Sequence, residues 1–595
     1  IESAAIQRKL YHHDYDLYMG HRRLSILDVT YAGHQPMSDL SKNIWISYNG
    51  EIYNFKELKL ELKKLGHKFI SNTDTEVIIY SYIEWGIDCI EKFNGMFAFS
   101  LYDNFKKKFY LCRDRYGIKP VYYHITKDKT FIYGSEIKSI LEYKDYKSEI
   151  DKEALVEYFT FQNIFTSKTL HKNIQILEAG HYFEIDLLTK SYKKLQYWDF
   201  DFKNPEIVKD EREYIEELER LFAQAVRRQL VSDVPLGCFL SGGIDSGSIT
   251  AITSNHFQQS NNILKTFTVG FDLTNTNDLE RSFDERAKAE FMSYKFKTEH
   301  YEMVLKSGDM ERCLENFAYH LEEPRVGQSY PNYYAAKLVS KFVKVVLSGI
   351  GGDELFAGYP WRYYNITNSK NFDDYIDKYY KYWQRLIPNR EIRNLFIPIS
   401  SNIKNVWTRD IFKNVFKKPT LMEKQEDYIN NSLYFEAKTF LHGLLVVEDK
   451  LSMSHSLETR VPFLDNDLVN FSQKIPVKFK LKNINSKKKM NENNISKHKN
   501  SDGKMIFRKS ISKYMSKDTN QAIKRGFSSP DQSWFKGDSK DFVKKKLLNS
   551  DGKIYNYLDK NTVQKLTKEH LSGKKNARLF IWSLLNFKTF LKLYG

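Results

Sequence analysis

Residues 234–253 read VPLGCFLSGGIDSGSITAIT, and this stretch decides the fold of the larger part of the chain. An apolar strand is expected at 236–240, followed directly by the turn SGGIDS at 241–246 and then by a helix. Glycine lets backbone N–H groups turn inward without a Cβ clash, and the positive end of the following helix points at the same place. The sequence therefore predicts a loop that binds phosphate.

The surrounding pattern places this loop in an α/β domain. A helix is expected at 214–231, and two further buried strands are expected at 264–271 and 342–349. Strands that alternate with helices favour a mostly parallel sheet. From about residue 370 the pattern becomes helical and rich in aromatic residues. No GxxxxGKS or GxxxxGKT occurs, so a loop that transfers the γ-phosphoryl group is not indicated.

The first 200 residues have a different sequence pattern, which is typical of short strands bounded by turns. Strands are expected at 43–55, 96–103 and 108–117, and a helix that stops at Gly66 lies between the first two. The polar segment around Pro205 is the best linker. We therefore predict one domain at 1–200, a linker at 201–212 and a second domain at 213–595.

The net charge of +17 is concentrated in one segment. Residues 478–525 hold fifteen Lys or Arg and three acids, a local charge of +12. The part at 480–505 is also rich in Asn and Ser, so it is predicted to be a solvated insertion. It has few aromatic residues, so we expect no nucleic-acid partner.

Other features of the composition restrict the class of protein. No run of about 18 uncharged apolar residues occurs, so no membrane partner is expected. The first residues carry charges where a signal peptide needs an apolar stretch. The four cysteines form neither a CxxC pair nor a zinc spacing, which is typical of free thiols in a reducing compartment. We therefore expect a cytoplasmic protein.

Three ordered motifs carry a family resemblance. SGGIDS resembles the pyrophosphate loop of the N-type ATP pyrophosphatases, which cleave ATP between the α and β phosphates. The stretches SGIGGDELFAGY at 348–359 and EDKLSMSHSLETRVPFLD at 448–465 resemble two signatures of asparagine synthetases. The resemblance implies adenylation of a carboxylate, which creates a mixed anhydride that ammonia can attack, with release of pyrophosphate.

The resemblance also implies roles for residues of this second domain. ATP and Mg²⁺ are the expected cofactors, and Asp245 and Asp353 are expected to hold the metal. Lys524, in KRGFSSP, matches a family lysine that stabilises the adenylation transition state, and we group it with Asp245 and Ser246 as catalytic. The expected ATP-binding residues are Leu240, Ser241, Gly242, Gly243, Asp245, Ser246, Val269, Ser348 and Gly349.

The first domain resembles the N-terminal-nucleophile glutaminase domain of the same synthetases, an αββα sandwich. Matching stretches include GHRRLSI at 20–26, NGEIYN at 49–54 and TDTE at 73–76. By resemblance, Arg23, Glu51 and Asp74 should hold the two ends of free glutamine. Asn49 and the backbone N–H of Gly50 should form the oxyanion hole.

The nucleophile of these glutaminases is an N-terminal cysteine, and this chain begins with Ile1 and has no cysteine before Cys89. Cys89 cannot supply a free α-amine. Either the sequence begins after that cysteine, or the domain has no glutaminase activity. We expect the first, because the residues that hold glutamine are in place.

Two possibilities remain for the carboxylate that accepts the nitrogen. One is aspartate, which with glutamine or ammonia gives asparagine; the other is a different carboxylate, such as a sugar acid of a surface polysaccharide. Asparagine synthetases commonly carry glutamate where this chain has Ile350, the position expected to assist formation of the adenylate. Glu322 or Glu323 could fill in for it. A non-catalytic protein is disfavoured by the intact motifs, and the resemblance leaves room for a homodimer.

Overall fold

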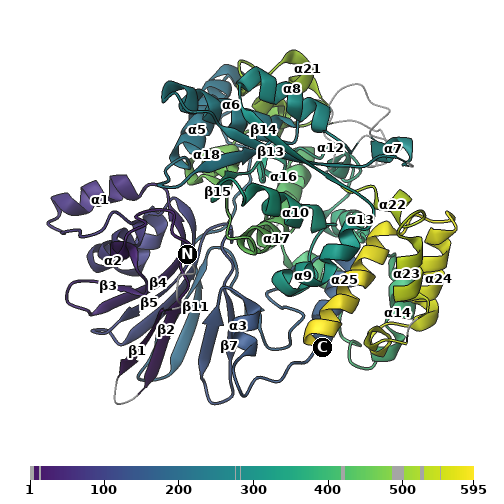
Figure 1. The fold of residues 1–595 in the computed structure, drawn as a ribbon, viewed down its shortest axis with the longest axis horizontal. Coiled ribbons are helices and arrows are strands. Elements are labelled where there is room, and N and C mark those ends of the chain that lie inside the picture. Colours follow the sequence, from purple (N-terminus) through teal and green to yellow (C-terminus); the bar gives the residue numbers. More distant parts are fainter. Residues whose placement is uncertain are drawn as a thin grey trace.

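The computed structural model describes residues 6–11, 15–274, 276–281, 283–416, 422–484, 502–522, 528–549 and 551–595. The strand-rich first part and the helix-rich remainder lie side by side (Figure 1). The strands are β1 Ile6–Tyr11, β2 Asp16–His21, β3 Met37–Ser38, β4 Ile44–Ile52, β5 Gly95–Asp103, β6 Lys108–Arg113, β7 Tyr122–Ile125, β8 Phe131–Gly134, β9 Gln175–Ile176, β10 His181–Asp186, β11 Ser191–Gln196, β12 Leu236–Phe239, β13 Lys265–Phe271, β14 Glu299–Leu305, β15 Val345–Leu347 and β16 Glu458–Arg460.

The helices are concentrated after residue 210. They are α1 Phe55–Lys64, α2 Asp74–Trp85, α3 Ile137–Leu141, α4 Lys152–Phe161, α5 Glu211–Arg228, α6 Ile244–Gln259, α7 Asp278–Arg281, α8 Arg286–Phe296, α9 Asp309–Leu321, α10 Tyr330–Val339, α11 Gly352–Leu355, α12 Pro360–Tyr363, α13 Phe372–Trp383, α14 Asn389–Leu395, α15 Thr408–Asn414, α16 Gln425–Glu436, α17 His442–Met453, α18 Asn466–Ser472, α19 Val477–Lys480, α20 Met505–Ser510, α21 Lys517–Gln521, α22 Asp531–Trp534, α23 Lys540–Leu547, α24 Lys560–Leu571 and α25 Arg578–Tyr594.

The first part is built on an antiparallel sheet with the strand order β11-β10-β6-β5-β4-β3. One face packs on α1 and α2 through apolar side chains such as Ile46, Leu62 and Ile78. The other face packs on β2 and on β7 of a smaller sheet, through side chains such as Met19 and Phe183. Helix α3 covers the far side of β7. The layer order is helix, sheet, sheet, helix, so the predicted αββα sandwich is confirmed.

The second part is built on a parallel sheet with the order β14-β13-β12-β15-β16. Helices α5, α6 and α8 pack on one face of this sheet and α10 packs on the other. Strand β12 is central because the chain runs from it to β13 and β14 on one side and then returns to β15 on its other side, which places a switch point at its carboxyl end. The predicted parallel α/β domain is confirmed.

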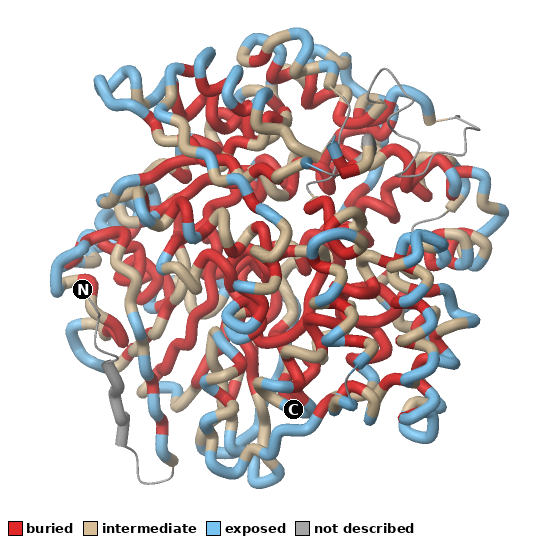
Figure 2. The backbone as a smooth tube through the Cα atoms, turned by 45° about the vertical axis from the view of Figure 1, so that its right-hand side comes forward, coloured by how far each residue is buried: buried red, intermediate tan, exposed pale blue. Residues whose placement is uncertain are grey.

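The helical C-terminal part surrounds a second core that is rich in aromatic rings. The ring centroids of Phe412 and Phe435 lie 4.4 Å apart, those of Trp383 and Phe435 lie 5.4 Å apart, and that of Phe412 lies 5.8 Å from a further aromatic ring. Trp582 of α25 is fully buried. Figure 2 shows buried residues through the middle of the molecule and exposed residues along its edge. The predicted helical, aromatic-rich part is therefore confirmed.

The two parts are joined by buried polar contacts. Lys119 Nζ donates to Asp449 at 2.8 Å, the Tyr116 hydroxyl donates to Asn466 at 2.9 Å, and Asn94 Nδ2 donates to Asp465 at 2.8 Å. All three donors come from the first part and all three acceptors from the motif 448–465 or the residue after it. Because unpaired polar groups are costly in an interior, these contacts hold the parts in register.

The basic insertion at 480–505 differs from its prediction at both ends. Residues 485–501 lie outside the described residues. Lys480 and Lys504, however, are buried rather than solvated, so the prediction is wrong for these two lysines. Residues close in sequence to each of these lysines pack into the core of the α/β domain. Composition alone does not indicate which lysines of a lysine-rich segment are buried. Within the described ranges, no helix is long and apolar enough to cross a membrane.

Candidate functional site

The loop after β12 has the form predicted from its sequence. Leu240 N donates to Phe267 O of β13 at 2.9 Å, which fixes the start of the loop. Gly242 has φ +72°, and Ser241 N donates to Ser246 Oγ at 3.1 Å. Gly243 begins α6 without a side-chain cap. The first backbone N–H groups of this helix have no hydrogen-bond partner within the helix, so this end of the helix can bind an anion.

A second loop, after β15, packs directly against the first. A methyl group at Gly349 would lie 2.9 Å from Cβ of Asp245 and 3.0 Å from Ser246 N, and one at Gly352 would lie 2.7 Å from Asp245 Oδ1. Glycine is required at both positions because the two loops approach so closely. Two motifs about a hundred residues apart in the sequence therefore meet at the carboxyl ends of neighbouring parallel strands.

Two carboxylates converge at this meeting point. Lys504 Nζ lies 2.6 Å from Asp245 Oδ2 and 2.6 Å from Asp353 Oδ1. The lysine side chain is 2% exposed, and its backbone N–H donates to Phe356 O at 3.1 Å. Because one ammonium contacts both acids, their oxygens surround a common point. Carboxylate oxygens are the ligands that Mg²⁺ prefers, so this pair fits the predicted metal.

A metal ion held by Asp245 and Asp353 would need further ligands, which the described residues do not supply at this point. Across the described ranges, no group of three or more His, Cys, Asp or Glu side chains is arranged to hold a metal. Mg²⁺ commonly takes one or two carboxylates together with phosphate oxygens and water. Two converging acids beside a phosphate loop match that pattern.

The other predicted nucleotide residues lie along the same edge of the sheet. Leu240 follows β12 and is buried, Val269 lies near the carboxyl end of β13, and Ser348 N donates to Arg460 O of β16 at 2.8 Å. The Thr268 hydroxyl donates to Leu240 O, which ties the first loop to β13. Lys524 lies outside the described residues. The structure thus brings Asp245, Asp353, Ser246 and the lining residues together.

Ile350 packs at the border of the α/β core, and the acids expected to fill in for it are engaged elsewhere. Glu322 accepts from Ile137 N at 2.9 Å and pairs with Lys450, while Glu323 pairs with Arg325. The expectation that either one replaces the missing glutamate therefore has no support in the geometry.

A different acid lies beside the second loop. Glu354 accepts from the Tyr359 hydroxyl at 3.1 Å and is buried. Burial, followed by the charge of Asp353, raises the pKa of Glu354 to about 7. Glu354 lies beyond the glycine turn, in α11.

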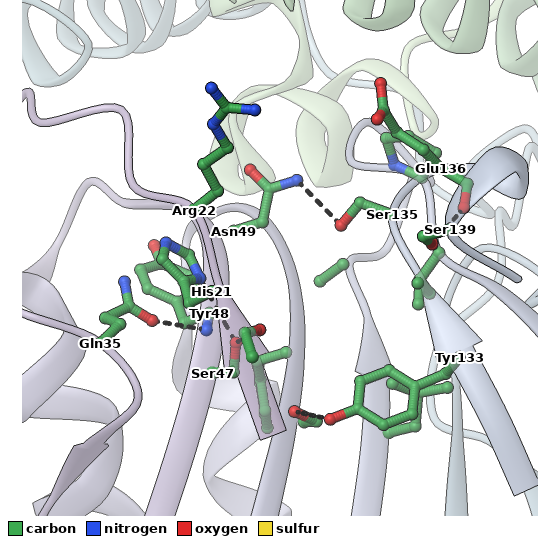
Figure 3. Close-up of a pocket in the computed structure, with 18 of the residues that line it drawn as sticks. His21, Arg22, Gln35, Ser47, Tyr48, Asn49, Tyr133, Ser135, Glu136 and Ser139 are labelled. Carbon is green, nitrogen blue, oxygen red and sulfur yellow. Dashed lines mark hydrogen bonds between the residues drawn. The ribbon is translucent and has the colours of Figure 1, made fainter. Parts of the chain in front are cut away.

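The first part contains a large cavity of about 1680 Å³ (Figure 3). Its wall includes all five predicted glutamine-binding residues, Arg23, Asn49, Gly50, Glu51 and Asp74. It also reaches Asp449, Lys450 and Glu458 of the second part. The cavity therefore extends from the predicted glutamine residues to the boundary between the two parts.

Arg23 is positioned by backbone carbonyls. Its Nη2 donates to Leu27 O at 2.6 Å and to Asp28 O at 2.8 Å. Gly33 lies against the guanidinium, where a methyl group would approach Nη2 to 2.2 Å. These contacts hold the fork in one orientation at the cavity wall, as recognition of a carboxylate requires.

Asp74 and Glu51 give the cavity an acidic end. Asp74 is the first residue of α2 and accepts from the Tyr48 hydroxyl at 2.6 Å and from Ile52 N at 2.8 Å. Burial raises the pKa of Asp74 to about 6, and burial together with Asp74 raises the pKa of Glu51. A cationic amino group bound here would lower both pKa values, so the pair suits an ammonium.

Asn49 and Gly50 lie at the end of β4 beside this acidic end. Asn49 Nδ2 faces Ser135 Oγ at 3.5 Å across the cavity (Figure 3). A side chain at Gly50 would meet Met96 O at 2.1 Å, so glycine is required for this strand to pair with β5. Sequence reasoning did not single out Ser135 as a site residue.

His21 is another wall residue that sequence reasoning did not assign. Its Nδ1 lies 3.3 Å from Ser47 Oγ, and burial together with Arg23 lowers the pKa of His21 to about 4. The imidazole is therefore neutral near pH 7. The motif GHRRLSI contained it, but nothing in the residue pattern separated it from a structural histidine.

All four cysteines are buried free thiols. Cys89 lies in the 3-10 helix Gly86–Lys92 and packs in the core under α2, and burial raises its pKa. Burial likewise raises the pKa of Cys238, to about 12. These four thiols are structural core residues.

Comparison with known proteins identifies the families of both parts. A family model described as asparagine synthase matches residues 217–592, and one described as a glutamine amidotransferase domain matches residues 7–198. The chain is 31% identical to glutamine-hydrolyzing asparagine synthetase 1 of Bacillus subtilis (strain 168), over 97% of this chain and 90% of that protein. It is 32% identical to asparagine synthetase 3 of the same organism, over 79% of this chain and 75% of that protein. The chain belongs to the asparagine synthase family and is an ATP-dependent, glutamine-using ligase.

Proposed function

We propose that this enzyme makes asparagine from aspartate: it joins the side-chain carboxylate to AMP and lets ammonia from glutamine displace the AMP. The observation that carries the proposal is the convergence of Asp245 and Asp353 on one point between two glycine loops. The wall residues Arg23, Glu51 and Asp74 support glutamine as the nitrogen donor.

In the synthetase half, we assign Asp245 and Asp353 to Mg²⁺, which would neutralise charge on the departing pyrophosphate. The N–H groups at the start of α6 would hold the phosphates, and Leu240, Val269 and Ser348 would lie along the nucleoside. Lys504 Nζ lies between these two carboxylates, so Mg²⁺ would replace the ammonium at this point when it binds. Lys524 is assigned to the adenylation transition state from the family motif alone.

In the glutaminase half, Arg23 would bind the α-carboxylate of glutamine while Asp74 and Glu51 bind its α-amino group. Recognition of both charged groups selects the free amino acid. Asn49 Nδ2 and Gly50 N–H would donate to the oxyanion formed when a nucleophile attacks the side-chain amide. Closure of this cavity against the second part would keep the released ammonia away from bulk water.

The identity of the acceptor is tested directly by product analysis. The enzyme is incubated with ATP, Mg²⁺, ammonium and a panel of carboxylates, and products are identified by mass spectrometry. Asparagine, AMP and pyrophosphate in equal amounts from aspartate are the expected result. Efficient product formation from another acid, with none from aspartate, would overturn the assignment of aspartate.

A second candidate acceptor is a carboxylate other than aspartate, such as a sugar acid. The observation that favours it is Ile350, whose aliphatic side chain cannot pair with a cationic group or take a proton. The same incubation separates the two, because a sugar acid would yield its amide while aspartate would not stimulate pyrophosphate release.

We also propose the cytoplasm as the compartment. Four free, buried thiols suit a reducing environment. ATP and free glutamine are consumed together, which fits the same compartment.

A further inference from the structure

One buried arginine lies between the two sites. Arg460 of β16 is 0% exposed, and its Nη2 lies 3.4 Å from Glu51 Oε1, a carboxylate assigned to glutamine. Its Nε donates to Glu458 at 2.8 Å. Burial of an arginine is tolerated only when acids and carbonyls surround it, so each of these contacts contributes to holding the guanidinium in place.

The backbone of the same residue touches the second ATP loop. Arg460 pairs with Leu347 in the parallel sheet, and its carbonyl accepts from Ser348 N at 2.8 Å. Ser348 is the first residue of the glycine loop that carries Asp353. A shift of Arg460 is therefore transmitted through one hydrogen bond to the start of that loop.

The remaining guanidinium nitrogen contacts the segment that leads into β12. Arg460 Nη1 donates to Gln229 O at 2.8 Å and to Val231 O at 2.7 Å. These carbonyls end α5 and begin the connection to β12, which runs into the loop at 241–246. The side chain of Arg460 thus contacts Glu51 of the glutamine site and the segment that enters β12, while its backbone carbonyl contacts the start of the second ATP loop.

Binding of glutamine would change the forces on this arginine. The α-amino group of glutamine would compete with the guanidinium for Glu51, because both are cations that need the same carboxylate. We propose that Arg460 is a positioning residue that couples occupancy of the glutamine site to the geometry of the second ATP loop. This inference rests on the proposed function, since it needs both ligands to bind where they are assigned.

The coupling is measurable as a ratio of affinities. The dissociation constant of glutamine is determined by calorimetry without nucleotide and with Mg²⁺ and an ATP analogue that cannot be cleaved between the α and β phosphates. In the wild-type chain the two constants should differ by at least about fivefold, the lower end of common allosteric coupling. In Arg460→Lys, which keeps the charge but loses the fork, the ratio should fall to within about twofold of one.

A matched control is available in the same chain. Arg325 is also fully buried and also pairs with a glutamate two residues before it, Glu323, and it donates to Ile164 O. None of these three residues is assigned to either ligand. Arg325→Lys should therefore keep the wild-type ratio. An equal loss of coupling in both variants would overturn the role of Arg460 and indicate general loosening.

A measurement on the unmodified chain covers the case in which Arg460→Lys does not fold. Glutamine alone should slow hydrogen exchange at least twofold in peptides that contain residues 345–352, while peptides from α24 should not change. Unchanged exchange at 345–352 with glutamine bound would overturn the inference.

The two levels of proposal fail in different ways. If glutamine or the nucleotide does not bind at all, the proposed function fails. If both bind but the wild-type ratio is one, only the coupling through Arg460 fails.

Discussion

At the residue scale, the decisive arrangement is an ammonium held between two acids. Asp245 is predicted to be indispensable, because it contacts Lys504 and lies against the second loop. Asp245→Asn should lower pyrophosphate release by at least about a hundredfold, since several kcal/mol of charge stabilisation in the transition state is lost. Pyrophosphate is measured with ammonium as nitrogen source, and circular dichroism checks the fold. Release at the native rate would contradict the assignment of the ATP site.

Lys504 gives a second prediction, about stability. Removing one partner of a buried ion pair leaves the other charge uncompensated and typically costs about 3–5 kcal/mol. Lys504→Met should therefore destabilise the chain, and Mg²⁺ should restore part of the loss because a cation can replace the ammonium between the acids. Thermal unfolding with and without Mg²⁺ measures both effects. A variant as stable as the wild type, with no larger response to Mg²⁺, would show that the acids are not held together by this lysine.

Lys480 is the matched comparison, because it is equally buried but has a different environment. Its Nζ lies 5.2 Å from the centre of the Phe202 ring, and burial lowers its pKa to about 7. The unfolded chain binds this proton up to its ordinary pKa near 10.5, so the residue makes stability rise with pH between about 7 and 10.5. Lys480→Met should stabilise the protein, and more at pH 7 than at pH 9. The same gain in melting temperature at both values would contradict the assignment.

At the scale of elements, the two glycine loops form one site only because they touch. Gly349→Ala would place a methyl group 2.9 Å from Cβ of Asp245, so the loops must separate. We expect at least a tenfold rise in the KM for ATP with little change in melting temperature. Gly552→Ala, where the nearest atom would be 3.5 Å away, is the control and should leave both unchanged. An unchanged KM for Gly349→Ala would mean that the contact does not matter for nucleotide binding.

Some elements of secondary structure could be predicted from the sequence, and others could not. The strand, glycine turn and helix at 236–259 were predictable because apolar residues and glycines encode them locally. Strand β11 was not, because all six of its residues are exposed, so no buried apolar positions alternate with polar ones along it. Strand β16 was hidden for the opposite reason: it is short, and its charged side chains are buried because Glu458 and Arg460 pair with each other and Arg460 also lies near Glu51.

The site was predictable to a similar extent. Motifs located Asp245, Asp353 and the five glutamine residues, because each motif keeps its residues close in sequence. Lys504 could not be recognised, because a lysine in a lysine-rich segment looks solvated until the fold brings acids from two loops to it. Contacts over long sequence separation, such as Arg460 with Glu51, leave no local pattern.

At the scale of the whole molecule, the cavity of the first part is completed by residues of the second. The cavity in the first part ends against Asp449, Lys450 and Glu458 of the second, so its wall is incomplete without the neighbour. The contact between Lys119 and Asp449, at 2.8 Å, lies in this boundary and is largely shielded from water. The charges of Asp449, Glu458 and Glu51 raise the pKa of Lys119 although burial opposes them. This lysine therefore stays charged and contributes to holding the parts together.

The final prediction tests whether this boundary makes the molecule a single cooperative unit. Lys119→Met should leave Asp449 unpaired at the boundary, which weakens the contact between the parts more than either part itself. We expect the wild type to unfold in one calorimetric transition and Lys119→Met to unfold in two, with the earlier one at least several degrees lower. Adding Asp449→Asn should recover part of the loss, because the buried charge that had lost its partner is also removed. Lys92, which pairs with Glu61 on the surface of the first part, provides the control, and Lys92→Met should keep one transition. If the loss of stability in the double variant equals the sum of the losses in the two single variants, the two residues do not stabilise the boundary as a pair.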